Sequence, residues 1–122
     1  MNHPIYPLKE EDEYFFDEGC HILEVLNTPG DPDVSIVRSR VEPGVTTRWH
    51  RLRGTAERYL IQAGIGDAYV GDGPSHRVAA GDVVLIPADV RQRIHNPGDS
   101  DLVFMAICSP RFTRDAYVDD EG

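Results

Sequence analysis

Turn-forming residues divide this chain into short segments, and this division limits its fold more than any other feature of the sequence. Proline interrupts helices and central strands, and glycine weakens both. The segments between the turns are rich in Val, Ile, Leu, Tyr and Phe, which favour strands. No window of about 11 residues has the apolar periodicity of a helix, so we expect helix only near residues 10–16 or 114–117. The sequence therefore predicts an all-β fold. The turn signals are Pro29-Gly30-Asp31-Pro32, Pro43-Gly44, Gly64-Ile65-Gly66-Asp67, Gly71-Asp72-Gly73-Pro74, Gly81-Asp82 and Asn96-Pro97-Gly98-Asp99, and the expected strands include 21–26, 34–41, 58–62, 67–70, 83–86 and 102–108.

The length and charge of the chain restrict its organisation and its partners. A chain of 122 residues suits one core, so we expect a single domain over residues 1–122. It has 12 Lys and Arg residues against 21 Asp and Glu residues, a formal charge of −9. An acidic surface repels nucleic-acid phosphates and anionic lipids, so neither is an expected partner. We interpret the acidic runs 10–13, 17–18 and 119–121 as solvated ends.

The cysteines and the apolar segments indicate the compartment. No apolar stretch approaches the roughly 20 residues of a membrane-spanning helix. The first residues lack the positive region and apolar run of a signal peptide. Cys20 and Cys108 lie far apart and form no Cys-x-x-Cys pair. We therefore expect a cytoplasmic protein with two free thiols.

Two spaced motifs carry the most specific information in the sequence. In the first, Gly44 is followed after five residues by His50, and Glu57 is followed after six residues by Gly64. Leu52 lies between the histidine and the glutamate. The second motif follows later in the chain, with five residues between its first two members, and consists of Gly81, Pro87, Asp89, Gln92 and Asn96.

These motifs resemble the two motifs of the cupin superfamily. The resemblance covers about residues 34–110 and implies a double-stranded β-helix, or jelly-roll, barrel of the small cupin 2 conserved barrel type, extended at both ends. The family pattern has a second histidine at position 52, a glycine at position 89 and a third histidine at position 92. This chain has Leu52, Asp89 and Gln92 at these positions. The resemblance also implies a homodimer, the usual assembly of the family.

The resemblance further implies a metal site with an altered ligand set. Cupins commonly bind a metal through three histidines and one glutamate, so the candidates here are His50, Glu57 and, as a weak neutral ligand, Gln92. One nitrogen and two oxygen ligands suit Mn, Fe, Zn or Ni. The alternative is that the site has lost its metal and that His50 forms a hydrogen bond to Glu57.

The resemblance implies that His50 and position 52 point into the barrel. Because residues two apart on a strand share a face, strand periodicity then predicts the other side chains that line the pocket. Arg48 would then be available to bind the carboxylate of an anionic substrate. The alternative is that a bulge turns Arg48 to solvent. Tyr59 is a candidate proton donor or a packed core aromatic. The expected pocket residues are Arg48, His50, Leu52, Glu57, Tyr59, Gln92 and Ile94.

Other polar residues are expected outside the pocket. His95 should point outward, and His76 should be exposed in a hairpin. Cys108 is expected to be a packed thiol on the last strand. The outward-facing residues on and after the first motif strand, which could pair with the acidic ends, are Trp49, Arg51, Arg53 and Arg58.

Three functions agree with this pattern. The first is a metal-dependent enzyme acting on a small anionic organic molecule, with His50, Glu57 and Gln92 at the metal and Glu57 or Tyr59 moving a proton. Its reaction could be that of a dioxygenase, an isomerase, a decarboxylase or a lyase. The second is a metal-free module that binds a small organic anion through Arg48 and Gln92 without turnover. The third is a structural dimer whose pocket has no function.

Overall fold

The computed structural model describes residues 4–121, so His3, to which the sequence assigns no role, lies outside the described residues. Within this range the chain forms strands and two short 3-10 turns, η1 (Glu10–Asp12) and η2 (Arg114–Ala116), and no α-helix. The expected helix near each end is thus one 3-10 turn. The all-β prediction is confirmed. The strands are β1 (Tyr14–Phe16), β2 (Cys20–Leu26), β3 (Ser35–Val41), β4 (His50–Leu52), β5 (Ala56–Ala63), β6 (Ile65–Val70), β7 (His76–Ala79), β8 (Val83–Ile86), β9 (Gln92–His95), β10 (Leu102–Ser109) and β11 (Tyr117–Asp119).

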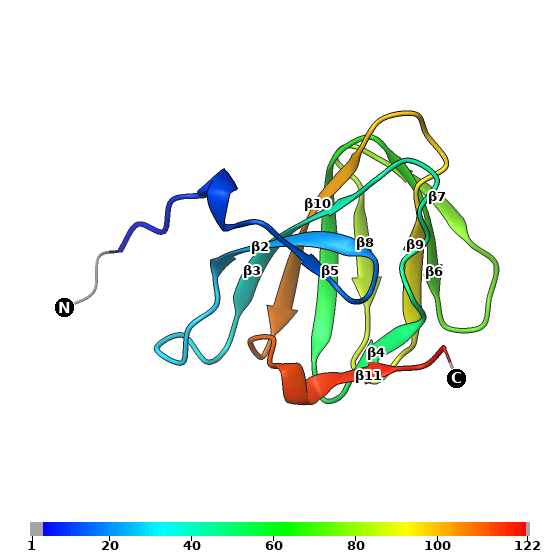
Figure 1. Cartoon of the computed structure of the whole chain (residues 1–122). Helices are drawn as coiled ribbons and strands as arrows, with labels where there is room; N and C mark the ends of the chain where they lie inside the picture. Colours follow the sequence, from blue (N-terminus) through cyan, green and yellow to red (C-terminus); the bar gives the residue numbers. More distant parts are fainter. Residues whose placement is uncertain (1–3, 122) are drawn as a thin grey trace.

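The strands form two antiparallel sheets that face each other (Figure 1). The first sheet has the strand order β1-β2-β3-β10-β5-β8, and the second has the order β11-β4-β9-β6-β7. Neighbouring strands in each sheet are often distant in sequence, since β10 lies between β3 and β5. This arrangement brings residues from the first and second motifs into one interior.

Alternating side chains build the core between the sheets. Along β3 and β10 every second residue is buried, which is the pattern of a strand with one face turned inward. Burying each large apolar side chain contributes about 1.5–3 kcal/mol relative to leaving it exposed. The fully buried apolar side chains are Leu23, Val41, Ile61, Ile86, Ile94, Leu102 and Phe104.

Two turn positions explain local features of the motifs. Gly64 has φ +80°, and a Cβ atom there would lie 2.6 Å from the carbonyl oxygen of Asp101, so a side chain does not fit. Asp89 has φ 68°, at the position where the family pattern has glycine. Asp tolerates this conformation, and its Oδ1 atom accepts a hydrogen bond from the Gly54 amide at 3.0 Å. The aspartate therefore replaces the glycine by tying together the turns of the two motifs.

The acidic ends of the chain lie on the barrel and bind arginines, which corrects their interpretation as solvated runs. Glu10 and Glu13 accept hydrogen bonds from Arg38, on the outer face of β3. At the other end, β11 pairs with β4, and Arg51 lies 3.7 Å from Asp120. The expected pairing of the outward arginines with an acidic end of the same chain is confirmed for Arg51.

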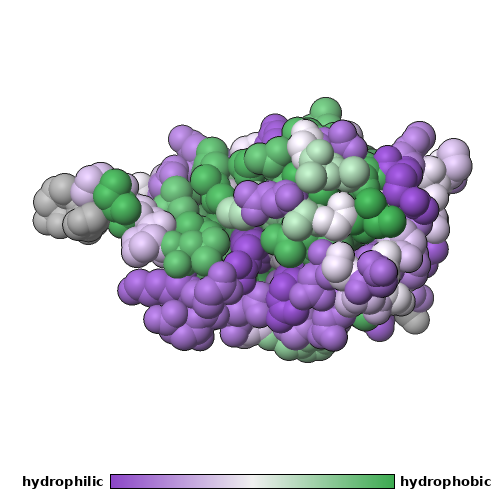
Figure 2. Space-filling view, turned by 90° about the horizontal axis from the view of Figure 1, so that it is seen from above, coloured by the Kyte–Doolittle hydropathy of each residue, from purple (hydrophilic) through white to green (hydrophobic). Residues whose placement is uncertain are grey.

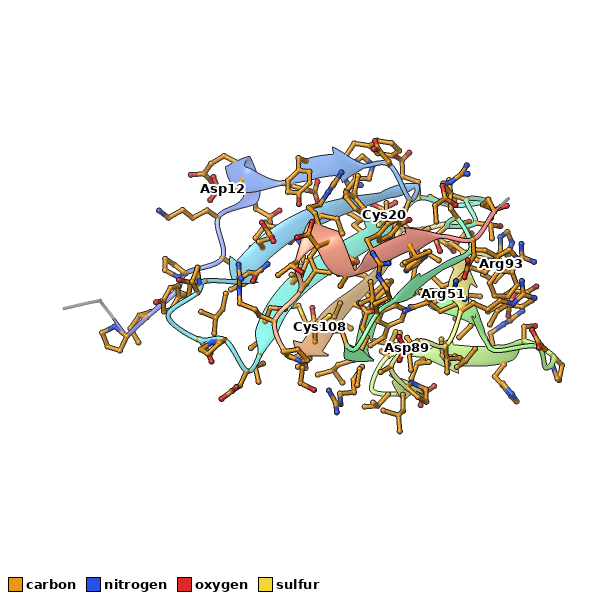
Figure 3. All side chains as sticks on the ribbon, turned by 90° about the horizontal axis from the view of Figure 1, so that it is seen from below. Asp12, Cys20, Arg51, Asp89, Arg93 and Cys108 are labelled. Atoms are coloured by element: carbon orange, nitrogen blue, oxygen red, sulfur yellow. The ribbon has the colours of Figure 1, made fainter. Side chains whose placement is uncertain are left out.

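The structure also bears on the predictions about membrane-spanning helices and about the two cysteines. Among residues 4–121, no helix has the length and apolar character that crossing a membrane requires. Cys20 and Cys108 are free and buried, and Figure 3 shows them on different strands. The free-thiol prediction is confirmed for both.

Candidate functional site

A pocket opens on the inner face of the six-stranded sheet. Its empty space is about 470 Å³ with the open solvent at the mouth included, and the part enclosed by protein is much smaller, about 50 Å³. Five strands of this sheet contribute to its wall, together with the β1–β2 turn and the segment after β10. The lining residues are Tyr14, Phe16, Glu18, Ile22, Glu24, Val37, Ser39, Glu57, Tyr59, Ala106, Cys108 and Phe112.

A buried chain of hydrogen bonds holds Glu57 at the inner end of the pocket. The Gln92 amide nitrogen donates to Glu57 Oε1 at 2.9 Å, and the Tyr59 hydroxyl donates to Gln92 Oε1 at 2.5 Å. Cys108 lies opposite Glu57 on β10, and its thiol also donates to the carboxyl group. All four side chains are buried. The Gln92 amide thus links the Glu57 carboxyl group to the Tyr59 phenol. The two hydrogen-bond partners of Glu57, an amide and a thiol, carry no positive charge.

This environment changes the acidity of Glu57. Burial raises its pKa to about 7, and repulsion from Glu18 acts in the same direction. The nearby His50 and the hydrogen bonds from Gln92 and Cys108 oppose the rise without cancelling it. A carboxyl group with a pKa near 7 exchanges protons readily at neutral pH, which is the property of a general acid or base.

The same burial keeps the neighbouring groups neutral. Burial raises the pKa of Tyr59 well above its usual range, so the phenol stays protonated at neutral pH. Burial and the charge of Glu57 likewise raise the pKa of the Cys108 thiol. Tyr59 therefore acts as a hydrogen-bond donor to Gln92 here, and its role as a proton donor to a substrate stays a prediction.

His50 lies beside this network, with a different carboxylate as its neighbour. Its backbone faces Gln92 across the β4–β9 pair, and its Nδ1 atom lies 2.7 Å from the Arg48 carbonyl oxygen. An Nδ1–H that donates to this carbonyl leaves Nε2 facing Glu18 Oε1 at 3.6 Å. Since Gln92 is the amide that binds Glu57, the expected hydrogen bond between His50 and Glu57 is replaced by these contacts.

Two site residues were not found from the sequence. Glu18 comes from the β1–β2 turn, its side chain is 12% exposed, and the Cys20 thiol donates to its Oε2 atom at 3.4 Å. Tyr117 of β11 stacks on the His50 ring, with 5.1 Å between the ring centroids. Both lie outside the two motifs. Glu18 belongs to an acidic run interpreted as solvated, so its placement in the pocket is a second correction of that interpretation.

Arg48 is outside the pocket, and the prediction that it faces the interior is wrong. The side chain is 47% exposed, and its guanidinium lies 3.0 Å from Asp119 Oδ2. Strand periodicity does not extend from His50 back to Arg48, because β4 begins at His50. The buried residue of the preceding segment is Thr47. The alternative, an irregular backbone that turns Arg48 to solvent, describes the structure.

The other expected pocket residues all face the interior, but they do not all line the pocket. Glu57 and Tyr59 are part of its lining. The expected pocket residues that are buried in the interior outside this lining are His50, Leu52, Gln92 and Ile94. His95 lies 2.7 Å from the Thr46 hydroxyl, away from Glu57 and Gln92, and His76 is exposed. Arg51 and Arg53 are exposed, as expected for the outward face of β4 and its turn.

The predicted metal ligands lie together, but Gln92 and Glu57 are hydrogen-bonded to each other in this structure. A metal site needs several deprotonated donors that are free to bind one ion. Gln92 uses its amide oxygen for Tyr59 and its nitrogen for Glu57. In the described part of the chain, no group of three or more His, Cys, Asp or Glu side chains is placed to hold an ion. The metal site with Mn, Fe, Zn or Ni stays a prediction.

Comparison with known proteins agrees with this geometry. A family model described as Cupin domain matches residues 37–108. A search of curated proteins found no match.

Among solved structures, a protein with a double-stranded β-helix domain from Klebsiella pneumoniae is 18% identical, with a TM-score of 0.76 and coverage of 93% of this chain and 88% of that one. Pac13, a nucleoside dehydratase from Streptomyces, is 18% identical, with a TM-score of 0.76 and coverage of 93% and 89%. A protein from Thermotoga maritima described as a predicted oxalate decarboxylase is 25% identical, with a TM-score of 0.68 and coverage of 75% and 80%. These likenesses establish the double-stranded β-helix fold.

Proposed function

The chain belongs to the Cupin domain family, and from this membership we propose that it is an enzyme that binds a small organic molecule in the barrel pocket and moves a proton through Glu57. Proton transfer to or from carbon or oxygen is the common step of isomerases and lyases, so these are the proposed reaction classes. Pac13, with the same fold, is a nucleoside dehydratase, and loss of water is a lyase reaction that a carboxylic acid can assist.

The observation that carries this proposal is the state of Glu57. It is buried at the inner end of a pocket, has neutral hydrogen-bond partners, and has a pKa raised to about 7. At neutral pH the carboxylic acid form would donate a proton to a leaving oxygen, and the carboxylate form would accept one. Gln92 and Cys108 would hold the group in position in either form.

The charges around the pocket also support a substrate that is not an anion. The expectation of an anionic substrate rested on Arg48, which pairs with Asp119 at the surface. The charged side chains of the lining are Glu18, Glu24 and Glu57. Carboxylates repel an anion, and we therefore propose a neutral or cationic substrate.

A carboxyl titration by NMR tests this function. We expect the Glu57 side-chain carbon to titrate near pH 7 and the signal to disappear in Glu57→Gln. A library of small neutral and cationic molecules, screened by thermal shift at pH 7, should give ligands whose effect depends on Glu57. A Glu57 pKa in the ordinary range of about 4 to 5 would remove the proposal.

A metal-dependent enzyme is the second candidate, because His50, Glu57 and Gln92 lie together in the interior. In this form they would be the ligands of Mn, Fe, Zn or Ni, after Gln92 had released Tyr59. Metal analysis of protein purified without a histidine tag tests it. Less than about a tenth of an equivalent of metal per chain, with no thermal shift on adding these ions, would exclude it.

We also propose that the protein is a homodimer in a reducing, cytoplasmic environment. The buried free cysteines support the second part. The first is supported by apolar side chains on the outer face of β5 and the edge strand β8, where Leu60, Val83 and Leu85 are exposed. Figure 2 shows further green surface toward the N-terminal end, and Ile5 and Leu8 are exposed in this segment. Light scattering of wild type and of Leu85→Glu tests the dimer, which the charge should weaken.

A further inference from the structure

The lining of the pocket has one sign of charge from its mouth to its inner end. Glu57 lies at the inner end, Glu18 on the β1–β2 turn, and Glu24 at the boundary with a second hollow outside. Among the described residues of the lining, none is Lys, Arg or His. We infer that the substrate of this pocket is a small organic ammonium ion. This inference rests on the proposed function, since it specifies the ligand of the same site.

The partners of the inner carboxylates leave room for such a charge. Glu57 is bound by a neutral amide and a neutral thiol. Glu18 is bound by the Cys20 thiol and has the His50 ring at 3.6 Å as its basic neighbour. Neither has the arginine partner that other glutamates of this chain have. Carboxylates in a recess of low dielectric without a guanidinium partner attract a cation more strongly than the same groups in water.

The walls of the pocket suit the organic part of an ammonium ion. Aromatic faces attract cations, and cages of aromatic rings with carboxylates are a common way to bind quaternary ammonium groups. Phe16 already takes a cation, because the Arg114 guanidinium lies 4.6 Å from its ring centroid. The aromatic residues of the lining are Tyr14, Phe16, Tyr59 and Phe112.

The arginines near the pocket are not part of its lining, although Arg114 contacts the ring of Phe16 in the wall. Arg48 pairs with Asp119 on the surface. Arg111 donates to Asn27 at 2.9 Å, and it lines the outer hollow together with Arg114. These arginines would repel an ammonium group from the outer hollow. The carboxylates would therefore stabilise the ammonium group in the inner pocket.

Three probes of one shape separate charge from size. Choline carries a trimethylammonium group, its carbon isostere carries a neutral tert-butyl group in that position, and the matching tert-butyl carboxylate is an anion. We expect calorimetry at pH 7 to give binding of choline at least about tenfold tighter than that of the neutral isostere. The carboxylate should not bind measurably.

A variant at the mouth tests the origin of the selectivity without disturbing the core. Glu24 is exposed, so Glu24→Gln should fold, and we expect it to weaken choline about threefold to tenfold while the neutral isostere is unaffected. Glu42→Gln is the matched control, because Glu42 is exposed and bound to His21 outside the pocket. It should leave all three affinities unchanged.

Two results would overturn the inference. One is equal binding of choline and its neutral isostere, and the other is no choline binding at about 50 mM. The titration of Glu57 distinguishes this failure from that of the proposed function. If Glu57 titrates near pH 7 and choline is not preferred, the ammonium substrate is wrong and the proton-transfer site stands. If Glu57 titrates in the ordinary range, the proposed function fails whatever choline does.

Discussion

Glu57 and Glu13 are both held by hydrogen bonds from residues distant in the sequence, yet their pKa values move in opposite directions. Glu13 precedes β1 and accepts hydrogen bonds from Arg40 at 2.7 and 3.1 Å and from Arg38 at 3.1 Å. The hydrogen bond to Arg40 is the main cause of its lowered pKa. Glu57 accepts hydrogen bonds from Gln92 and Cys108, and burial raises its pKa to about 7.

The difference shows that the charge of the partner, as well as burial, decides what a carboxyl group can do. Two guanidinium groups keep Glu13 ionised at every physiological pH, so its role is to fasten the N-terminal segment to the outer face of β3. An amide and a thiol satisfy the geometry of Glu57 without fixing its charge. The interior group therefore remains able to gain or lose a proton.

The largest effect is expected from a variant whose interior can bind a metal ion next to Glu57. Leu52→His combined with Gln92→His restores the usual ligand set of the family, and we expect its affinity for Zn or Mn to exceed that of wild type at least about a hundredfold. Calorimetry with each ion measures the gain.

Arg51→His with Arg93→His is the matched control for this pair. Arg51 and Arg93 are the outward neighbours of the two positions on β4 and β9. Arg51 is exposed, and Arg93 is half-buried. The control should bind metal like wild type. A folded interior variant that binds no tighter than the control would show that positions 52 and 92 do not form a common site with His50 and Glu57.

The next largest effect is on the pH dependence of stability. A carboxyl group with a raised native pKa binds a proton more tightly when folded, so stability falls as pH rises from its unfolded pKa of 4.5 through the native value near 7. We expect wild type to lose about 3 kcal/mol of unfolding free energy from this group between pH 5 and pH 8. Glu57→Gln should not show this loss.

Urea denaturation of both proteins across this pH range measures the difference. Glu13 has the opposite sign, because a lowered pKa adds stability that is lost as pH falls through the native value. It is present in both proteins and cancels from the comparison. Parallel stability curves for wild type and Glu57→Gln would contradict the raised pKa.

A somewhat smaller effect is expected from removing the amide between Glu57 and Tyr59. Gln92→Leu leaves the Glu57 Oε1 atom and the Tyr59 hydroxyl buried without their partner, which should destabilise the protein by about 2–3 kcal/mol at pH 7. Gln62→Leu is the control, because Gln62 is exposed on β5, and its effect should stay within about 0.5 kcal/mol. Equal losses in the two variants would mean that the amide does not support the interior network.

The sequence predicted the fold and the inner part of the site because both depend on local rules. Turn residues and alternating apolar side chains determine short strands, and the resemblance of the two motifs to those of the cupin family implies that His50, Glu57 and Gln92 face inward. The prediction failed at Arg48, where the same alternation was continued past the start of β4. Periodicity applies only within a strand, and the sequence does not mark where that short strand begins.

The missed residues depend on tertiary contacts that no local pattern reveals. Glu18 enters the pocket because β1 folds back on β2, and its neighbours in sequence are ordinary acidic and glycine residues. Tyr117 reaches His50 because β11 pairs with β4, from the far end of the chain. The substitution of Asp89 for glycine has a local reason, a left-handed turn, but its hydrogen bond to Gly54 appears only in the structure.

The smallest effect is expected from a substitution at Glu13. Glu13→Gln keeps the shape of the side chain and removes its charge. The hydrogen bonds from Arg38 and Arg40 then become weaker, and the two guanidinium groups repel each other more strongly. Because these groups are partly screened by water, we expect a loss of no more than about 1 kcal/mol at pH 7, falling to nothing at low pH, where wild-type Glu13 is itself protonated. Urea denaturation measures it, with Glu11→Gln as an exposed control from the same segment. A loss as large as that of Gln92→Leu would mean that the N-terminal segment contributes as much to stability as the interior network does. Glu13 and Glu57 would then differ in pKa but not in their contribution to stability.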